Sequence, residues 1–120
     1  FSRNYGFDGM IIINKITQLS MARNYSTTGK GFSFDENTIE TVWRKGEIEP
    51  TYSGFRKDKC GASMQRSKYG KTEQWGWEID HIKPVALGGT DDVSNLQPLQ
   101  WENNRKKSDN YPTWSCEVRS

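Results

Sequence analysis

Asp80 and His81 stand side by side in this 120-residue chain, and two asparagines follow at wider spacing. Asn95 lies 14 positions after His81, and Asn104 lies 23 positions after it. His81 is the only histidine of the chain, and imidazole is the side chain that titrates near neutral pH. It is therefore the natural general base for taking a proton from a water molecule.

Asp80 and Asn104 are the candidate ligands for a divalent cation. Asp80 offers an anionic carboxylate oxygen, and Asn104 offers a neutral amide oxygen. Two oxygen ligands leave the remaining octahedral positions for water and a substrate phosphate, which suits Mg²⁺. We expect Mn²⁺ to substitute, because it takes similar oxygen ligands. A cation and a base at one place would together support hydrolysis of a phosphodiester.

Three short elements are expected to position these residues. Apolar and polar side chains alternate over residues 75–82, which indicates a half-buried strand, and the Gly-Gly-Thr-Asp-Asp run at residues 88–92 indicates a turn. Residues 95–99 predict a second strand, which Pro98 confines to a sheet edge. Residues 100–107 predict a short helix with Trp101 on its inner side. The predicted order is strand, loop, strand, helix.

This pattern resembles the HNH endonuclease motif. The resemblance rests on Trp-Glu-Ile-Asp-His-Ile-Lys-Pro at 77–84, the Gly-Gly-Thr-Asp-Asp run, Asn-Leu-Gln-Pro-Leu at 95–99 and Asn-Asn-Arg-Lys-Lys at 103–107. It covers about residues 76–110. It implies a ββα-metal (His-Me finger) fold and an endonuclease that hydrolyses DNA with one metal ion and a histidine general base.

The resemblance also assigns roles to single residues. Asn95 matches the middle asparagine, which orients the histidine and the loop, so we expect it to support the non-reactive imidazole nitrogen. The N-x-x-K register favours Asn104 over Asn103 as the metal ligand, although the two side chains point about 100° apart on a helix. Lys107 and Arg105 are expected to approach substrate phosphate. Many members hold a structural zinc with two C-x-x-C pairs, which this chain lacks; we expect no structural zinc and infer that aromatic packing replaces it.

Basic residues gather at residues 55–71 and again at residues 105–107. Residues 55–71 hold six basic side chains and one acid, although the net charge of the whole chain is only +2. Such clusters bind polyanions by displacing condensed counterions, so we expect DNA, double-stranded, as the partner. The candidate contacts are Arg56, Lys57, Lys59, Arg66, Lys68 and Lys71.

The rest of the chain predicts a small α+β domain at residues 33–120 with an additional helix before the motif. The apolar spacing at Ile39, Val42 and Trp43 predicts that helix at about residues 35–45, with Ser33 and Glu36 as a capping box. A hairpin through residues 60–66 is weakly indicated. Residues 1–32 are expected to form an arm that is irregular or in part a tag, with a short helix at 11–21.

Several alternatives stay open at this stage. Cys60 and Cys116 form a disulfide or remain as buried thiols. The absence of a long apolar run argues against a membrane span and a signal peptide, so we expect a cytoplasmic location. Nicking is compatible with a monomer, whereas a palindromic double-strand cut demands a homodimer. The competing function is a non-catalytic nucleic-acid-binding module that keeps the ββα shape.

Overall fold

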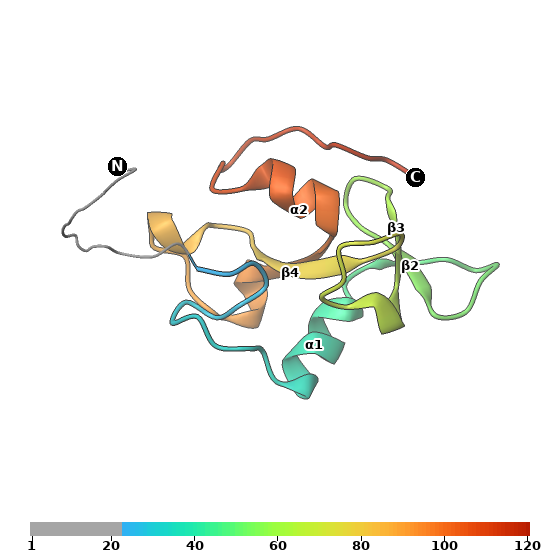
Figure 1. Cartoon of the computed structure of the whole chain (residues 1–120), viewed down its shortest axis with the longest axis horizontal. Coiled ribbons are helices and arrows are strands. Elements are labelled where there is room, and N and C mark those ends of the chain that lie inside the picture. The colour runs from blue at the N-terminus through green and yellow to red at the C-terminus, as the bar shows by residue number, and fades with distance from the viewer. Residues whose placement is uncertain (1–22) are drawn as a thin grey trace.

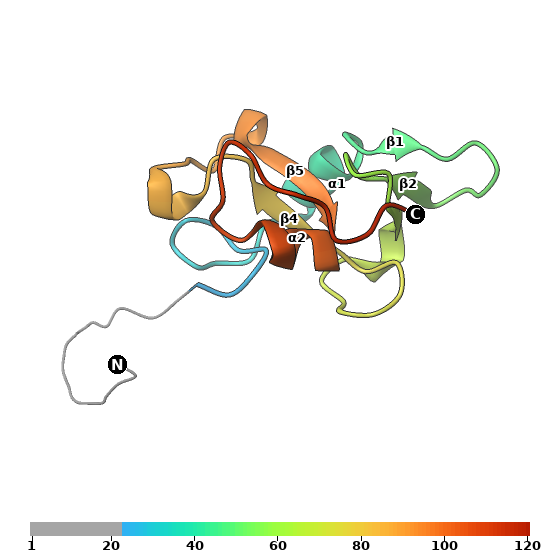
Figure 2. The same cartoon turned by 90° about the horizontal axis from the view of Figure 1, so that it is seen from above.

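The computed structural model describes residues 23–120, which form two antiparallel sheets and two α-helices (Figures 1 and 2). This α+β class is the one that the sequence predicts. The helix predicted at residues 11–21 lies outside the described residues. In chain order the elements are α1 (Glu36–Trp43), β1 (Glu47–Ile48), β2 (Phe55–Lys57), β3 (Ser63–Gln65), β4 (Trp77–His81), β5 (Leu96–Gln100) and α2 (Trp101–Lys107), with short 3₁₀ turns at Arg66–Lys68, Val85–Leu87 and Val93–Asn95.

Strands β4 and β5 form a two-stranded antiparallel sheet, which confirms the strand predicted at residues 75–82. The expectation that this strand is half-buried is wrong, because all five residues of β4 are buried between the two helices. Trp77 pairs with Gln100 at one end, and His81 pairs with Leu96 at the other. Because only two strands are present in this sheet, each is an edge, so Pro98 costs no ladder hydrogen bond on its outer side. Helix α2 starts directly after β5, which completes the predicted strand, loop, strand and helix order.

The two helices lie on opposite sides of the β4–β5 sheet, with α2 above it and α1 below it in Figure 1. The side facing α1 carries the apolar core, in which the indole rings of Trp43 and Trp77 lie 5.0 Å apart. Neither helix is long and apolar enough to cross a membrane, and the same holds throughout residues 23–120. The core residues are Phe34, Ile39, Val42, Trp43, Met64, Trp77, Ile79 and Leu96.

Helix α1 forms where its apolar spacing predicts, but its N-cap is not the predicted capping box of Ser33 and Glu36. The side chain of Asp35, rather than that of Ser33, accepts a hydrogen bond from the backbone N–H of Thr38 at 2.7 Å. Glu36 lies in the first turn and pairs with Arg66 instead of completing a capping box. An aspartate in this place satisfies an orphan amide and also faces the positive end of the helix.

Strands β1, β2 and β3 form the second sheet, at the end of β4 that lies away from His81 (Figure 1). The hairpin predicted through residues 60–66 is displaced, because β2 and β3 pair with each other around a turn at residues 58–62. That turn is held by the side chain of Asp58. The end of β4 that carries His81 leads into the loop of residues 82–95.

Candidate active site

Asp80, His81 and Asn104 line one pocket of about 510 Å³. Asp80 and His81 are the last two residues of β4, and Asn104 lies in the middle of α2. All three are buried, with exposed fractions of 7%, 5% and 4%. The strand and the helix thus bring together the three residues on which the sequence-based hypothesis depends.

The carboxylate of Asp80 is held from two sides. Its Oδ2 accepts a hydrogen bond from Nε2 of Gln97 at 2.9 Å, and its Oδ1 lies 3.3 Å from Nζ of Lys107. Burial raises the pKa of the Asp80 carboxyl above its usual range, and the contacts with Gln97 and Lys107 oppose that shift. A further cation beside this buried carboxyl group would stabilise its ionised form.

Asn104 is fixed by its amide nitrogen. Its Nδ2 donates to Oε1 of the buried Glu78 at 2.8 Å, while its Oδ1 accepts no hydrogen bond from within residues 23–120. The neighbouring Asn103 is fully buried elsewhere and bonds Asp58 and the backbone of Val118. Of the two asparagines, only Asn104 lines the pocket.

The donor set fits Mg²⁺ by its chemistry. One carboxylate and one amide oxygen are hard ligands, and a shell of this size leaves room for water and phosphate. In the described part of the chain, no three or more His, Cys, Asp or Glu side chains lie together so that they could hold a metal ion. Asp80 and Asn104 are thus the oxygen donors that a cation in this pocket would meet.

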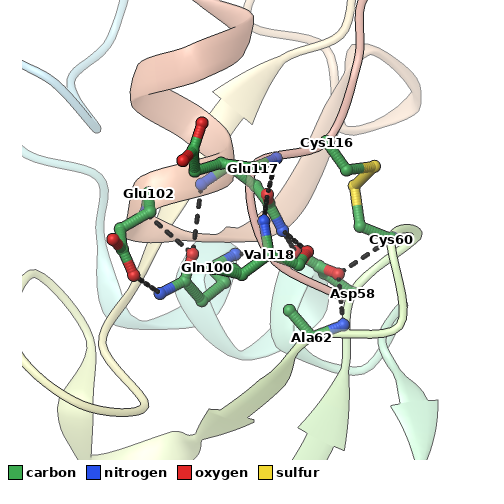
Figure 3. The surroundings of a disulfide bond; sticks show 9 residues. Asp58, Cys60, Ala62, Gln100, Glu102, Cys116, Glu117 and Val118 are labelled. Carbon is green, nitrogen blue, oxygen red and sulfur yellow. Dashed lines mark hydrogen bonds between the residues drawn. A yellow bond between two sulfur atoms is a disulfide. The ribbon is translucent and has the colours of Figure 1, made fainter. Parts of the chain in front are cut away.

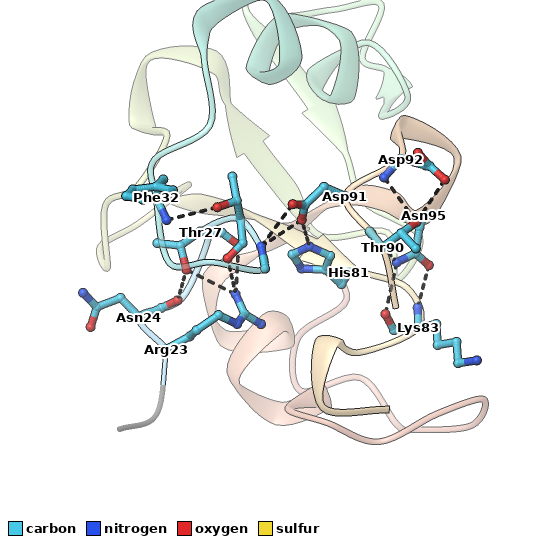
Figure 4. A network of polar contacts seen from close by, with 12 residues as sticks. Arg23, Asn24, Thr27, Phe32, His81, Lys83, Thr90, Asp91, Asp92 and Asn95 are labelled. Atoms are coloured by element: carbon cyan, nitrogen blue, oxygen red, sulfur yellow. Dashed lines mark hydrogen bonds and ion pairs between the residues drawn. The ribbon is translucent and has the colours of Figure 1, made fainter. Parts of the chain in front are cut away.

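His81 is oriented by an aspartate, not by Asn95. Its Nε2 lies 2.8 Å from Oδ1 of Asp91 (Figure 4), and its ring packs against Phe34 with centroids 6.0 Å apart. The hydrogen bond with His81 lowers the pKa of Asp91, and the backbone N–H of Gly29 adds to that effect. The expectation that Asn95 supports the imidazole is therefore wrong, because the loop carries Asp91 to that nitrogen.

Asn95 fastens the loop of residues 82–95 at its base (Figure 4). Its Oδ1 accepts from the backbone N–H of Lys83, and its Nδ2 donates to the carbonyls of Lys83 and Thr90. Gly88 has a φ of 93°, and a Cβ atom on Gly89 would collide with the Lys83 carbonyl oxygen. The Gly-Gly pair is thus required by a left-handed turn and a close backbone approach.

Residues 23–33 form one wall of the pocket. The backbone N–H of Gly29 donates to the Asp91 carboxylate at 2.9 Å, and the Ser26 hydroxyl accepts from the N–H of Ile79 in β4. Thr27 and Ser33 form an isolated antiparallel bridge, so this segment is a tight hairpin. This part of the predicted arm therefore lines the site. Nothing in the amino-acid composition of the arm predicts that role.

Lys107 does not face solvent as a phosphate contact would, whereas the side chain of Arg105 is 37% exposed. The side chain of Lys107 is 1% exposed, and its Nζ donates to the backbone carbonyl of His81 at 2.9 Å. The guanidinium of Arg105 pairs with Glu78 at 2.9 Å and lies 3.9 Å above the ring of Tyr25. The prediction of a phosphate contact is therefore wrong for Lys107, which is buried and bonds the His81 backbone. For Arg105 it stays a prediction, because that side chain is partly exposed while it pairs with Glu78.

The basic cluster of residues 55–71 is partly neutralised. Arg66 pairs with two glutamates of α1, Lys68 pairs with Glu73, and Arg56 donates to the backbone carbonyl of Gly46. Arg56, Lys57, Lys59 and Lys71 make no ion pair within residues 23–120, and Lys59 lies over the ring of Trp114. These four side chains are the members of the cluster that have no acidic partner in the described part of the chain.

The sequence does not predict the contacts that Glu78, Gln97 and Asp91 make in the site. Glu78 and Asp80 share one face of β4, and this period of two is a signal that sequence reasoning could have used. Gln97 lies directly opposite Asp80 in the strand register. Nothing local distinguishes Asp91 from other turn residues.

The disulfide Cys60–Cys116 joins the β2–β3 turn to the C-terminal segment (Figure 3). Beside it, the buried Asp58 accepts from the N–H groups of Cys60, Ala62 and Gln100 and from Nδ2 of Asn103. The Asn103 side chain also binds the backbone of residues 117 and 118. With both cysteines oxidised, no thiolate is available for zinc. The disulfide and the hydrogen bonds of Asp58 and Asn103 therefore stabilise this part of the fold, where aromatic packing alone was expected to do so.

Removal of the disulfide is expected to lower the free energy of unfolding while the protein still folds. The bond closes a loop across 56 positions, and chain-entropy arguments give about 2–5 kcal/mol for such a loop. Cys60→Ser should therefore unfold at a clearly lower urea concentration than the wild type, and dithiothreitol should reproduce that shift only in the wild type. A variant that unfolds at the wild-type midpoint would contradict the expectation.

Comparison with known proteins agrees with this geometry. The family model of the HNH endonucleases matches residues 60–110, which span the disulfide turn, both strands of the site and α2. No curated protein and no solved structure was found to match the chain. Asp80, His81 and Asn104, which line one pocket, all lie inside the segment that matches the HNH endonuclease family model.

Proposed function

We propose that this protein is a metal-dependent HNH endonuclease that hydrolyses phosphodiester bonds in DNA with a one-metal mechanism. The observation that carries the proposal is the shared pocket of Asp80, His81 and Asn104, each more than nine-tenths buried. A protein that only binds nucleic acid gains nothing from burying a carboxylate and an imidazole beside an unpaired amide oxygen, because such burial costs desolvation energy.

His81 acts as the general base in this proposal. Its Nε2 is occupied by Asp91, so Nδ1 is the nitrogen left to take a proton from water. Lys107 holds the His81 backbone in place through the carbonyl, and Asn95 fixes the loop that follows. The scissile phosphate would enter the pocket between His81 and the oxygen ligands.

Asp80 and Asn104 would hold Mg²⁺, which Mn²⁺ could replace. When bound, the cation supplies charge stabilisation at the phosphoryl oxygen and at the leaving oxygen. Gln97 and Glu78 keep the two ligands oriented, one through the carboxylate and one through the amide nitrogen. Loss of such supporting partners commonly costs about 10- to 100-fold in metal affinity or activity.

Double-stranded DNA is the proposed substrate, with Lys57, Lys59 and Lys71 as contacts to its backbone. A monomer suffices for nicking, and a homodimer would be needed for a symmetric double-strand cut. The disulfide favours an oxidising compartment over the cytoplasmic location expected from the sequence, because cytosolic thiols are kept reduced.

A plasmid-nicking assay tests the function directly. Supercoiled plasmid should be converted to open circle with Mg²⁺ or Mn²⁺, and EDTA should stop the reaction. His81→Ala should lower the rate by about 10²- to 10⁴-fold, the usual contribution of a general base. Lys106→Ala is a matched control, because Lys106 is half-exposed and lies outside the pocket.

Two outcomes would decide against the proposal. If the wild type and His81→Ala are equally inactive on single- and double-stranded substrates while DNA is still bound, the protein is a binding module that keeps the fold. If cleavage continues undiminished in EDTA or in His81→Ala, the assignment of the cation or of the base is wrong.

A further inference from the structure

Asp91 connects three parts of the site. Its Oδ1 accepts the hydrogen bond with Nε2 of His81 and also the N–H of Gly29, at 2.8 and 2.9 Å. Gly29 belongs to the hairpin that walls the pocket, and the loop carrying Asp91 is fastened by Asn95. The side chain of Asp91 remains 46% exposed, so its position follows from these bonds and not from burial.

The direction of the hydrogen bond follows from the chemistry of the carboxylate. Gly29 can only donate, and an ionised carboxylate can only accept, so the proton of the shared bond resides on Nε2 of His81. The hydrogen bond from His81 lowers the pKa of Asp91, which keeps it in the accepting form. A neutral imidazole with its proton on Nε2 has its lone pair on Nδ1, where no protein partner occurs within residues 23–120.

We propose that Asp91 is a positioning residue that holds His81 with its proton on Nε2 and its basic lone pair on Nδ1. The inference rests on the proposed function, because it deepens the role of His81 as general base. Asp91 does not touch the scissile phosphate in this account and acts only through the imidazole. The partner of an imidazole selects which ring nitrogen is protonated and fixes the plane of the ring.

Cleavage kinetics test one half of the proposal. Asp91→Ala should reduce kcat by about 10- to 100-fold, the size of effect that hydrogen-bond partners of metal-bound histidines have. KM for DNA and the Mg²⁺ concentration for half-maximal activity should stay unchanged, because no substrate contact or metal ligand is removed. Asp91→Asn, which retains one accepting oxygen, should recover part of kcat. The matched control is Asp92→Ala, since Asp92 is the next residue and bonds only within its turn.

A spectroscopic measurement tests the other half without depending on cleavage. Because His81 is the only histidine, protein labelled with ¹⁵N-histidine gives the signals of one imidazole. In the wild type the proton on Nε2 should be visible and shifted downfield by the carboxylate. In Asp91→Ala that signal should be lost to exchange with water, whereas Asp92→Ala should keep it.

The two measurements separate the possible failures. If the Nε2 proton signal is unchanged in Asp91→Ala, the positioning role is wrong even where the wild type cleaves DNA. If the signal behaves as expected but the wild type never cleaves, the proposed function fails while the hydrogen-bond assignment stands. A faster kcat in Asp91→Ala would overturn the inference, since it would mean that Asp91 blocks the reactive nitrogen.

Discussion

Asp58→Ala is expected to lose most of its folding stability, although Asp58 lies outside the pocket. The Asp58 side chain accepts four hydrogen bonds at 2.9–3.0 Å, and Asp58 is only 4% exposed. Alanine would leave four buried N–H donors without a partner, and each such donor costs about 1–3 kcal/mol. Small domains are stable by about 5–15 kcal/mol in total, so the loss approaches the whole.

Urea unfolding followed by tryptophan fluorescence would measure this loss. Asp58→Asn is the informative companion, because it keeps the volume and one accepting oxygen but turns an NH₂ group toward two donors. It should fall between alanine and the wild type. Asp92→Asn removes the same charge from an exposed turn and should change the free energy of unfolding by less than about 0.5 kcal/mol. An Asp58→Ala protein within about 1 kcal/mol of the wild type would show that water satisfies these donors.

The sequence predicts the β4–β5–α2 part of the fold because local rules act there without competition. Alternation of side chains, the glycine pair and the short helix each follow from nearest-neighbour geometry. The cap of α1 was mispredicted, since Ser33 and Asp35 are both good N-cap residues and only the packing of the helix selects between them. The β2–β3 turn was displaced because Asp58, not a turn-forming pair, sets its position.

The site was predictable in its residues but not in its contacts. Asp80, His81 and Asn104 belong to the stretch that resembles the HNH endonuclease motif, and that resemblance implies that they meet. The partner of His81 depends on how the loop of residues 82–95 folds back, and many conformations of a loop this long are compatible with its sequence. Net charge likewise cannot reveal that Lys107 is buried, because burial is decided by the tertiary partners of its side chain.

Lys107→Met is expected to destabilise the protein in the absence of metal and to make Mg²⁺ a stronger stabiliser. Methionine fills the space of the buried stem but removes the charge that lies 3.3 Å from Asp80. Leaving one partner of a buried ion pair alone costs about 3–5 kcal/mol. Mg²⁺ bound at Asp80 and Asn104 would then restore a cation beside the uncompensated carboxylate.

Thermal unfolding of three proteins, each with EDTA and with saturating Mg²⁺, tests this expectation in six measurements. The rise of Tm caused by Mg²⁺ should be larger in Lys107→Met than in the wild type, because a ligand stabilises in proportion to its binding to the folded state. Lys106→Met is the matched control, since Lys106 is half-exposed and forms only a 3.6 Å pair with Glu117. Its Tm should stay near that of the wild type in both conditions. Equal Mg²⁺ shifts in all three proteins would mean that the cation does not bind at Asp80, and the metal ligands proposed here would have to be sought elsewhere.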